Sequence, residues 1–152
     1  MAVGKAWNQN RDFARILRDV ERRVSVEARD EKFGLELIRT PTRSFWVKEG
    51  QDEAWSGRRL LAYLLAEHDW VEAENPENMV RPGDVVVDCG AHVGVFTSKA
   101  LRRGAARVVA VEPDPTNLEC LRRNLAEEAA DGRVVIVPRG VWSTATELVL
   151  VE

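Results

Sequence analysis

Two acidic residues, each at the end of an apolar run, stand where this sequence could best bind a small polar ligand. Asp88 is followed by Gly90 and Gly94, and Glu112 comes 24 positions after Asp88. Glycine permits a sharp turn because it lacks a Cβ atom, and the amides that open a helix favour negative or polar ligand groups. The spacing of the two acids is typical of one strand–helix–strand step in a nucleotide-binding sheet.

The residue type at position 88 discriminates between two cofactors. Sites for NAD begin with a glycine that lets the backbone approach the pyrophosphate, whereas this sequence has Asp88 there. A carboxylate repels a pyrophosphate and attracts the ammonium group of S-adenosylmethionine, so the pattern favours S-adenosylmethionine. Two alternatives stay open. One is a non-catalytic module that binds the cofactor or a partner chain, and the other, less favoured, is an NAD(P)-dependent oxidoreductase.

Four segments together resemble the FkbM family of S-adenosylmethionine-dependent methyltransferases. They are the runs 88–94 (DCGAHVG), 111–115 (VEPDP), 124–125 (NL) and 140–143 (GVWS). The resemblance implies methyl transfer to oxygen, with a hydroxyl of a sugar or secondary metabolite as the acceptor. It also implies a set of cofactor-binding residues: Asp88, Gly90, Ala91, His92, Gly94, Glu112, Pro113, Gly140 and Val141. For His92 we expect a contribution through the backbone amide rather than acid–base work.

The elements that must position these residues are typical of an α/β fold. Apolar runs at 85–87, 107–111 and 134–137 predict strands buried on both faces, and the stretches 94–103 and 115–129 predict the helices between them. This β-α-β-α-β order is half of a doubly wound, Rossmann-like parallel sheet. We therefore expect residues 81–152 to form the N-terminal half of a class I methyltransferase domain that binds S-adenosylmethionine.

Residues 1–80 are expected to form an extension of helices and a hairpin. Apolar spacing predicts helices over 11–29 and 58–68, while alternation around Thr40-Pro-Thr predicts a hairpin of 33–39 with 44–48. The run 147–152 alternates like a further strand. Without a neighbour, the valine run 85–87 would be an exposed sheet edge, so we expect the chain to be part of a longer fold. The acceptor pocket and the catalytic base would then lie beyond Glu152.

Composition excludes several classes of protein. The 152 residues are 45% hydrophobic and 31% charged with a net charge of −3, which argues against intrinsic disorder. No apolar run approaches the length of a membrane span, no secretory signal is visible, and two cysteines cannot form a disulfide framework or a four-ligand zinc site. We expect a cytoplasmic protein with a small-molecule acceptor, for which a homo-oligomer is one possible state. A pI of about 5.6 leads us to expect no nucleic acid partner. We also expect no membrane partner and no metal.

Overall fold

The computed structural model describes residues 2–50, 56–144 and 146. The chain divides into two compact units, Met1–Met79 and Val80–Glu152. Each unit has a sheet of its own, one antiparallel and one parallel, and each is described by itself below.

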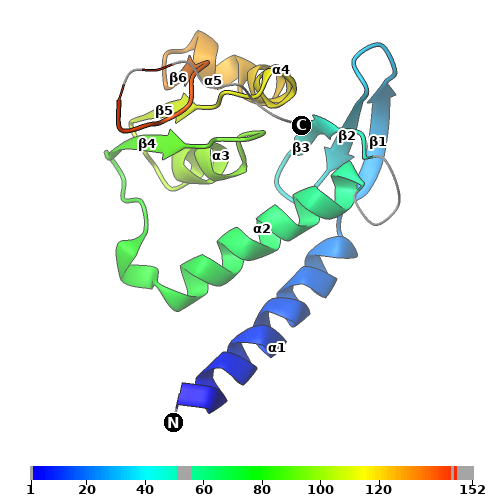
Figure 1. Ribbon diagram of the computed structural model, residues 1–152, viewed down its shortest axis with the longest axis vertical. Coiled ribbons are helices and arrows are strands. Elements are labelled where there is room, and N and C mark those ends of the chain that lie inside the picture. The colour runs from blue at the N-terminus through cyan, green and yellow to red at the C-terminus, as the bar shows by residue number, and fades with distance from the viewer. Residues whose placement is uncertain (1, 51–55, 145, 147–152) are drawn as a thin grey trace. The chain divides into compact units, whose positions relative to one another are not determined.

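The described residues of the first unit form three helical segments and three strands (Figure 1). In chain order they are α1 (Ala2–Glu21), β1 (Ser25–Asp30), β2 (Leu35–Arg39), β3 (Ser44–Lys48), α2 (Gly57–Glu74) and the short 3₁₀ helix η1 (Pro76–Asn78). The strands pair antiparallel in the order β1-β2-β3, and Arg39 lies opposite Ser44 across the turn. The predicted hairpin is therefore confirmed, and the helix predicted at 58–68 extends to Glu74.

The helix predicted over residues 11–29 is wrong in its second half. Helix α1 ends at Glu21, and Ser25–Asp30 form strand β1. The apolar spacing continues past Glu21, but these residues pair with β2, and Asp30 lies opposite Leu35. Backbone pairing with a neighbouring strand outweighs a weak local preference for helix.

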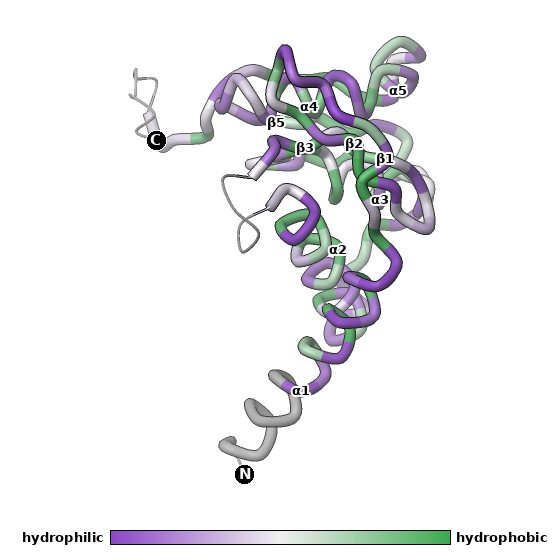
Figure 2. The backbone as a smooth tube through the Cα atoms, turned by 90° about the vertical axis from the view of Figure 1, so that its right-hand side faces the viewer, coloured by the Kyte–Doolittle hydropathy of each residue, from purple (hydrophilic) through white to green (hydrophobic). Residues whose placement is uncertain are grey.

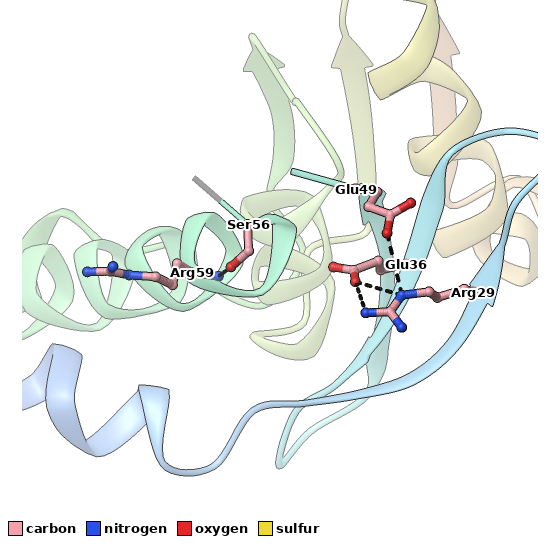
Figure 3. Close-up of polar contacts among 5 residues, drawn as sticks. All are labelled: Arg29, Glu36, Glu49, Ser56 and Arg59. Carbon is pink, nitrogen blue, oxygen red and sulfur yellow. Dashed lines mark hydrogen bonds and ion pairs between the residues drawn. The ribbon is translucent and has the colours of Figure 1, made fainter. Parts of the chain in front are cut away.

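An ion-pair cluster fastens β1 to its neighbours (Figure 3). The guanidinium of Arg29 donates from Nη2 and Nε to Glu36 Oε1, at 3.0 and 3.1 Å, and Arg29 Nε lies 3.5 Å from Glu49 Oε1. Glu36 is buried, and a buried carboxylate requires such a partner because desolvation penalises its charge. The pair therefore fixes the register of an otherwise exposed edge strand.

Helix α2 contacts β2 and β3, and its buried residues are the small or apolar Gly57, Leu61, Ala62 and Ala66. Hydrophobic and hydrophilic residues alternate along it (Figure 2). Ser56 caps its start, accepting a hydrogen bond from the Arg59 amide at 3.3 Å (Figure 3). A Cβ atom at Gly57 would lie 2.7 Å from Val47 Cγ2, so glycine allows the helix to begin against β3. The ring of Phe13 in α1 meets Tyr63 of α2 edge-on, with centroids 5.3 Å apart.

The second unit is a parallel sheet with helical crossovers (Figure 1). Its elements are β4 (Val85–Cys89), α3 (Val95–Arg102), β5 (Arg107–Val111), α4 (Pro115–Asn124), α5 (Ala126–Ala130) and β6 (Val134–Val137). The strand order is β4-β5-β6, with both pairs parallel. The predicted β-α-β-α-β order is confirmed. The helix predicted over 115–129 is interrupted at Leu125, which caps both α4 and α5.

The core of the second unit lies on one face of this sheet. Ala110 and Val134 pack with Leu118, Leu121 and Leu125 in a buried cluster. A second cluster joins Val108 to residues of α3 and of the loop that follows it. The prediction of strands buried on both faces is wrong for β4, and for β6 at Val135, in the described chain. Val85, Val87 and Val135 are 69%, 62% and 43% exposed, because the helices of this unit pack on the opposite face of the sheet.

No helix among the described residues is long and apolar enough to cross a membrane. The strand predicted at 147–152 lies outside the described residues.

Candidate functional site

The predicted site residues gather at the carboxyl ends of three adjacent parallel strands. Asp88 is the last residue but one of β4, and residues 90–94 form the loop to α3, here called the glycine loop. Glu112 follows β5, and Gly140 follows β6 by a few residues. Ligands of open α/β sheets bind beyond the carboxyl ends of the strands. The parallel register therefore brings together residues up to 52 positions apart in the sequence.

Glu112 ties the glycine loop to the end of β5. Its Oε2 atom accepts a hydrogen bond from the His92 amide at 2.8 Å, and its Oε1 atom accepts one from the Asp114 amide at 2.9 Å. The Asn117 side chain adds a longer contact to Oε1, at 3.4 Å. An ionised carboxylate offers about four acceptor positions, so the remaining one lies on Oε2. That position suits one hydroxyl of a ribose.

Asp88 is oriented by a residue that the sequence analysis did not single out. The Thr97 hydroxyl on α3 donates to Asp88 Oδ2 at 2.6 Å, and both side chains are buried. An anionic acceptor makes this a strong hydrogen bond. The carboxylate is therefore held in a fixed direction at the mouth of the loop. The signal in the sequence was a hydroxyl residue one turn into the helix after the loop.

The two glycines of the loop have different functions. Both have left-handed backbone, with φ of 83° at Gly90 and 89° at Gly94. A Cβ atom at Gly90 would meet nothing within 4 Å, whereas one at Gly94 would lie 2.8 Å from Leu121 Cδ1. Gly90 therefore borders open space where a ligand could lie, and Gly94 allows α3 to pack against α4. Ala91 is likewise a core residue, packed with Ala110 and Leu118.

Most amides of the glycine loop are already bonded within the protein. The amides of Gly90 and Ala91 both donate to the Val111 carbonyl, at 2.9 and 3.0 Å, and the Gly94 amide donates to the Ala91 carbonyl at 2.8 Å. Helix α3, in contrast, begins at Val95, and its N-cap residue Gly94 has no side chain that could cap it. The first amides of a helix have no partner within it and favour anions. They suit the carboxylate of an amino acid ligand.

His92 supports the loop through its backbone. It is the one non-glycine residue with positive φ in the described chain, at 51°, and its amide donates to Glu112. Burial lowers the pKa of the imidazole, although Glu112 and Asp114 act in the opposite direction. Nδ1 is buried without a hydrogen-bond partner. These surroundings favour a neutral imidazole at pH 7.

The loop after β6 approaches the loop after β5. A Cβ atom at Gly140 would lie 3.9 Å from Pro113 Cβ, which places these two predicted residues side by side. Val141 and Trp142 are 60% and 65% exposed. An exposed apolar surface of this kind, in the loop that approaches Pro113, is suited to an aromatic base.

The two cysteines differ in reactivity, which gives a simple test of the second unit. Cys89 is exposed, whereas Cys120 on α4 is fully buried, and burial raises the pKa of its thiol to about 12. Only the thiolate reacts with alkylating agents. At pH 8 we expect iodoacetamide to label Cys89 in the native protein and Cys120 only after denaturation, as read by peptide mass spectrometry. Equal labelling of both in the native protein would contradict the buried position of Cys120.

The parallel sheet, the loop after its first strand and the acid after its second strand define a Rossmann-like fold of the class I methyltransferase type. Residues 88–150 match the family model described as the methyltransferase FkbM domain. The resemblance of this segment to the FkbM family is thereby confirmed.

Known proteins similar to this chain are methyltransferases. A ribosomal protein L11 methyltransferase from Pelotomaculum thermopropionicum is 41% identical over 61 residues, which are 40% of this chain and 20% of that protein. A mitochondrial ribosomal RNA small subunit methyltransferase from Arabidopsis thaliana is 29% identical over 133 residues, 88% of this chain and 30% of that protein. The crystal structure of a putative RNA methyltransferase from Pyrococcus horikoshii superposes with a TM-score of 0.42 and 28% identity, covering 56% of this chain and 39% of that one. The chain thus spans less than a third of the length of either curated relative.

These comparisons correct one expectation. The expectation that this chain has no nucleic acid partner is wrong, because relatives of this chain are named for ribosomal RNA and for a ribosomal protein. The exclusion rested on the near-neutral charge of the whole chain. Net charge describes an average and does not report on a local surface, and the relatives are several times longer than the segment they share with this chain.

Proposed function

We propose that this chain binds S-adenosylmethionine at the carboxyl ends of β4, β5 and β6 and supplies the cofactor site of a methyltransferase. The observation that carries the proposal is the 2.8 Å hydrogen bond from the His92 amide to Glu112 Oε2. This bond joins the glycine loop and the second acid, predicted separately from sequence, into one site. Asp88 would face the ammonium group of the cofactor, and Glu112 would accept from a ribose hydroxyl.

The remaining groups suit the remaining parts of the cofactor. The uncapped start of α3 would hold the methionine carboxylate, the open side of Gly90 would accommodate the chain, and Gly140 and Val141 would flank the adenine. When bound, S-adenosylmethionine supplies a methyl group already activated on its sulfonium. The task of the protein is then to align the acceptor for in-line attack.

The acceptor is the second part of the proposal. The FkbM resemblance predicts a hydroxyl acceptor, whereas the relatives are named for ribosomal RNA and a ribosomal protein. Transfer of radiolabelled methyl groups to RNA, to ribosomal protein and to small hydroxyl compounds, tested in parallel, distinguishes these acceptors. Cytoplasmic location also stays a prediction.

The cofactor proposal is tested by titration calorimetry with S-adenosylmethionine and with NAD. We expect the chain to bind the first and not the second. Asp88→Asn keeps the shape of the side chain but removes its charge, so the affinity for S-adenosylmethionine should fall about tenfold or more, as loss of a hydrogen bond between charged groups predicts.

Asp84→Asn is the matched control. Asp84 lies just before Val85, the first residue of β4, and so at the end of the strand away from the proposed site. It accepts a hydrogen bond from the Arg81 amide at 2.8 Å. This variant should bind as the wild type does. Binding of NAD in preference would favour the oxidoreductase alternative. Binding of neither compound, or equal losses in both variants, would refute the proposed site.

A further inference from the structure

Asn124, the last residue of α4, makes a buried contact with the glycine loop. Its side-chain Nδ2 donates to the Val93 carbonyl at 2.9 Å, across 31 positions of the sequence. Asn124 is 3% exposed and Val93 is 1% exposed. A buried side-chain amide of this kind is costly unless it is hydrogen-bonded, so its presence at this position calls for a specific function.

The loop that Asn124 holds has left-handed backbone at three of its five residues, Gly90, His92 and Gly94, with φ between 51° and 89°. The two glycines adopt it without strain, whereas His92 has a Cβ atom. A non-glycine residue keeps this conformation only where several surrounding contacts determine it. Contacts with the end of β5 hold amides of the loop: Val111 accepts from Gly90 and Ala91, and Glu112 accepts from His92.

Helix α4 holds the other end of the loop. The Asn124 side chain donates a hydrogen bond to the Val93 carbonyl. The side chains of Leu121 and Leu125 occupy the position where a Cβ atom of residue 94 would lie. Leu121, Asn124 and the C-cap residue Leu125 are neighbours at the end of α4, because residues three or four positions apart are adjacent on a helix. The loop and the start of α3 therefore pack against the end of α4.

We propose that Asn124 is a positioning residue, which keeps the glycine loop in the conformation that binds the cofactor. It acts through the Val93 carbonyl. The inference rests on the proposed function for its link to cofactor affinity, but the effect on the loop itself is independent of that function. When the competent conformation is only partly populated, the apparent dissociation constant rises in inverse proportion to its population.

The test compares Asn124→Leu with two controls. Leucine has a similar size but no donor, so the Val93 carbonyl loses its partner. Val108→Ala removes core volume in the second cluster, where Val108 packs with Ala100 and Ala105, and controls for loss of stability. Asn75→Leu removes an amide-to-carbonyl bond of similar length, 3.0 Å to Val71, in the first unit.

Two readouts are measured on the full chain: the dissociation constant for S-adenosylmethionine, and hydrogen exchange of the loop amides by mass spectrometry. For Asn124→Leu we expect about tenfold weaker binding or more and faster exchange in residues 90–94. For both controls we expect binding within about twofold of the wild type and unchanged loop exchange. Asn124→Ser, which is too short to reach Val93, should behave as Asn124→Leu and replaces it if that variant does not fold.

Wild-type exchange in the loop of the Asn124 variants would overturn the inference, and so would wild-type affinity. Weaker binding by Val108→Ala, in proportion to its loss of stability, would also overturn it, because the effect would then be general destabilisation. If the wild-type protein does not bind S-adenosylmethionine, the proposed function fails. Loop exchange in the Asn124 variants then decides the inference alone.

Discussion

Replacement of Gly94 by alanine should lower the free energy of unfolding of the second unit by about 2–5 kcal/mol, the sum of two effects. A left-handed backbone costs a residue with a side chain roughly 1–2 kcal/mol, and φ at Gly94 is 89°. The added Cβ atom would lie 2.8 Å from Leu121 Cδ1 and 3.0 Å from Leu125 Cδ1. Overpacking of a core typically costs about 1–3 kcal/mol. Urea unfolding of the two proteins measures the difference.

Gly132→Ala separates the two effects, because Gly132 has φ of 81° and an added methyl group there would meet no atom within 4 Å. The free energy of unfolding of this variant should fall only by the cost of a left-handed backbone, roughly 1–2 kcal/mol. Gly90→Ala should be similar in stability but should also reduce cofactor affinity, since its methyl group enters the open side of the loop. Equal losses at Gly94 and Gly132 would show that the contact between α3 and α4 at Gly94 has no energetic importance.

Replacement of Glu112 by alanine should lower the free energy of unfolding by about 2–6 kcal/mol, even without cofactor. The amides of His92 and Asp114 would both lose their acceptor, and each partly buried donor left without a partner costs about 1–3 kcal/mol. Glu112→Gln should show a smaller loss, because one oxygen remains to accept. Cofactor affinity should fall in both variants, and in the alanine variant partly because the glycine loop loses its fastening.

Glu119→Ala provides the comparison for this second prediction. Glu119 is partly exposed and forms an ion pair with Arg123 at 2.7 Å, four positions along the same helix. Pairs of this kind contribute about 0.3–0.5 kcal/mol, so the stability of this variant should be close to that of the wild type. A similarly small effect of Glu112→Ala would mean that its hydrogen bonds do not hold the loop.

Much of the second unit was predictable from the sequence because its signals are local. Runs of valine indicate strands, Asp114 followed by Pro115 indicates the start of a helix, and the structure shows Asp114 accepting from the Asn117 amide at 2.7 Å. The FkbM resemblance rests on the same local motifs. The first unit was less predictable. The apolar spacing at 22–29 is compatible with a helix, and only pairing with β2 makes 25–30 a strand.

The residue types of the site and their order along the chain are thus properties of the sequence by itself. Which contacts each of these residues makes is decided by the tertiary structure. The sequence shows Gly90 and Gly94 only as two glycines of one loop. The structure distinguishes them, because Gly94 packs against Leu121 whereas Gly90 borders open space. The contact of Glu112 with the His92 amide of the loop is likewise a product of the tertiary structure. Thr97 and Asn124 support the site through hydrogen bonds across 9 and 31 positions. Contacts over such distances depend on how the helices pack, which periodicity and motif spacing do not specify.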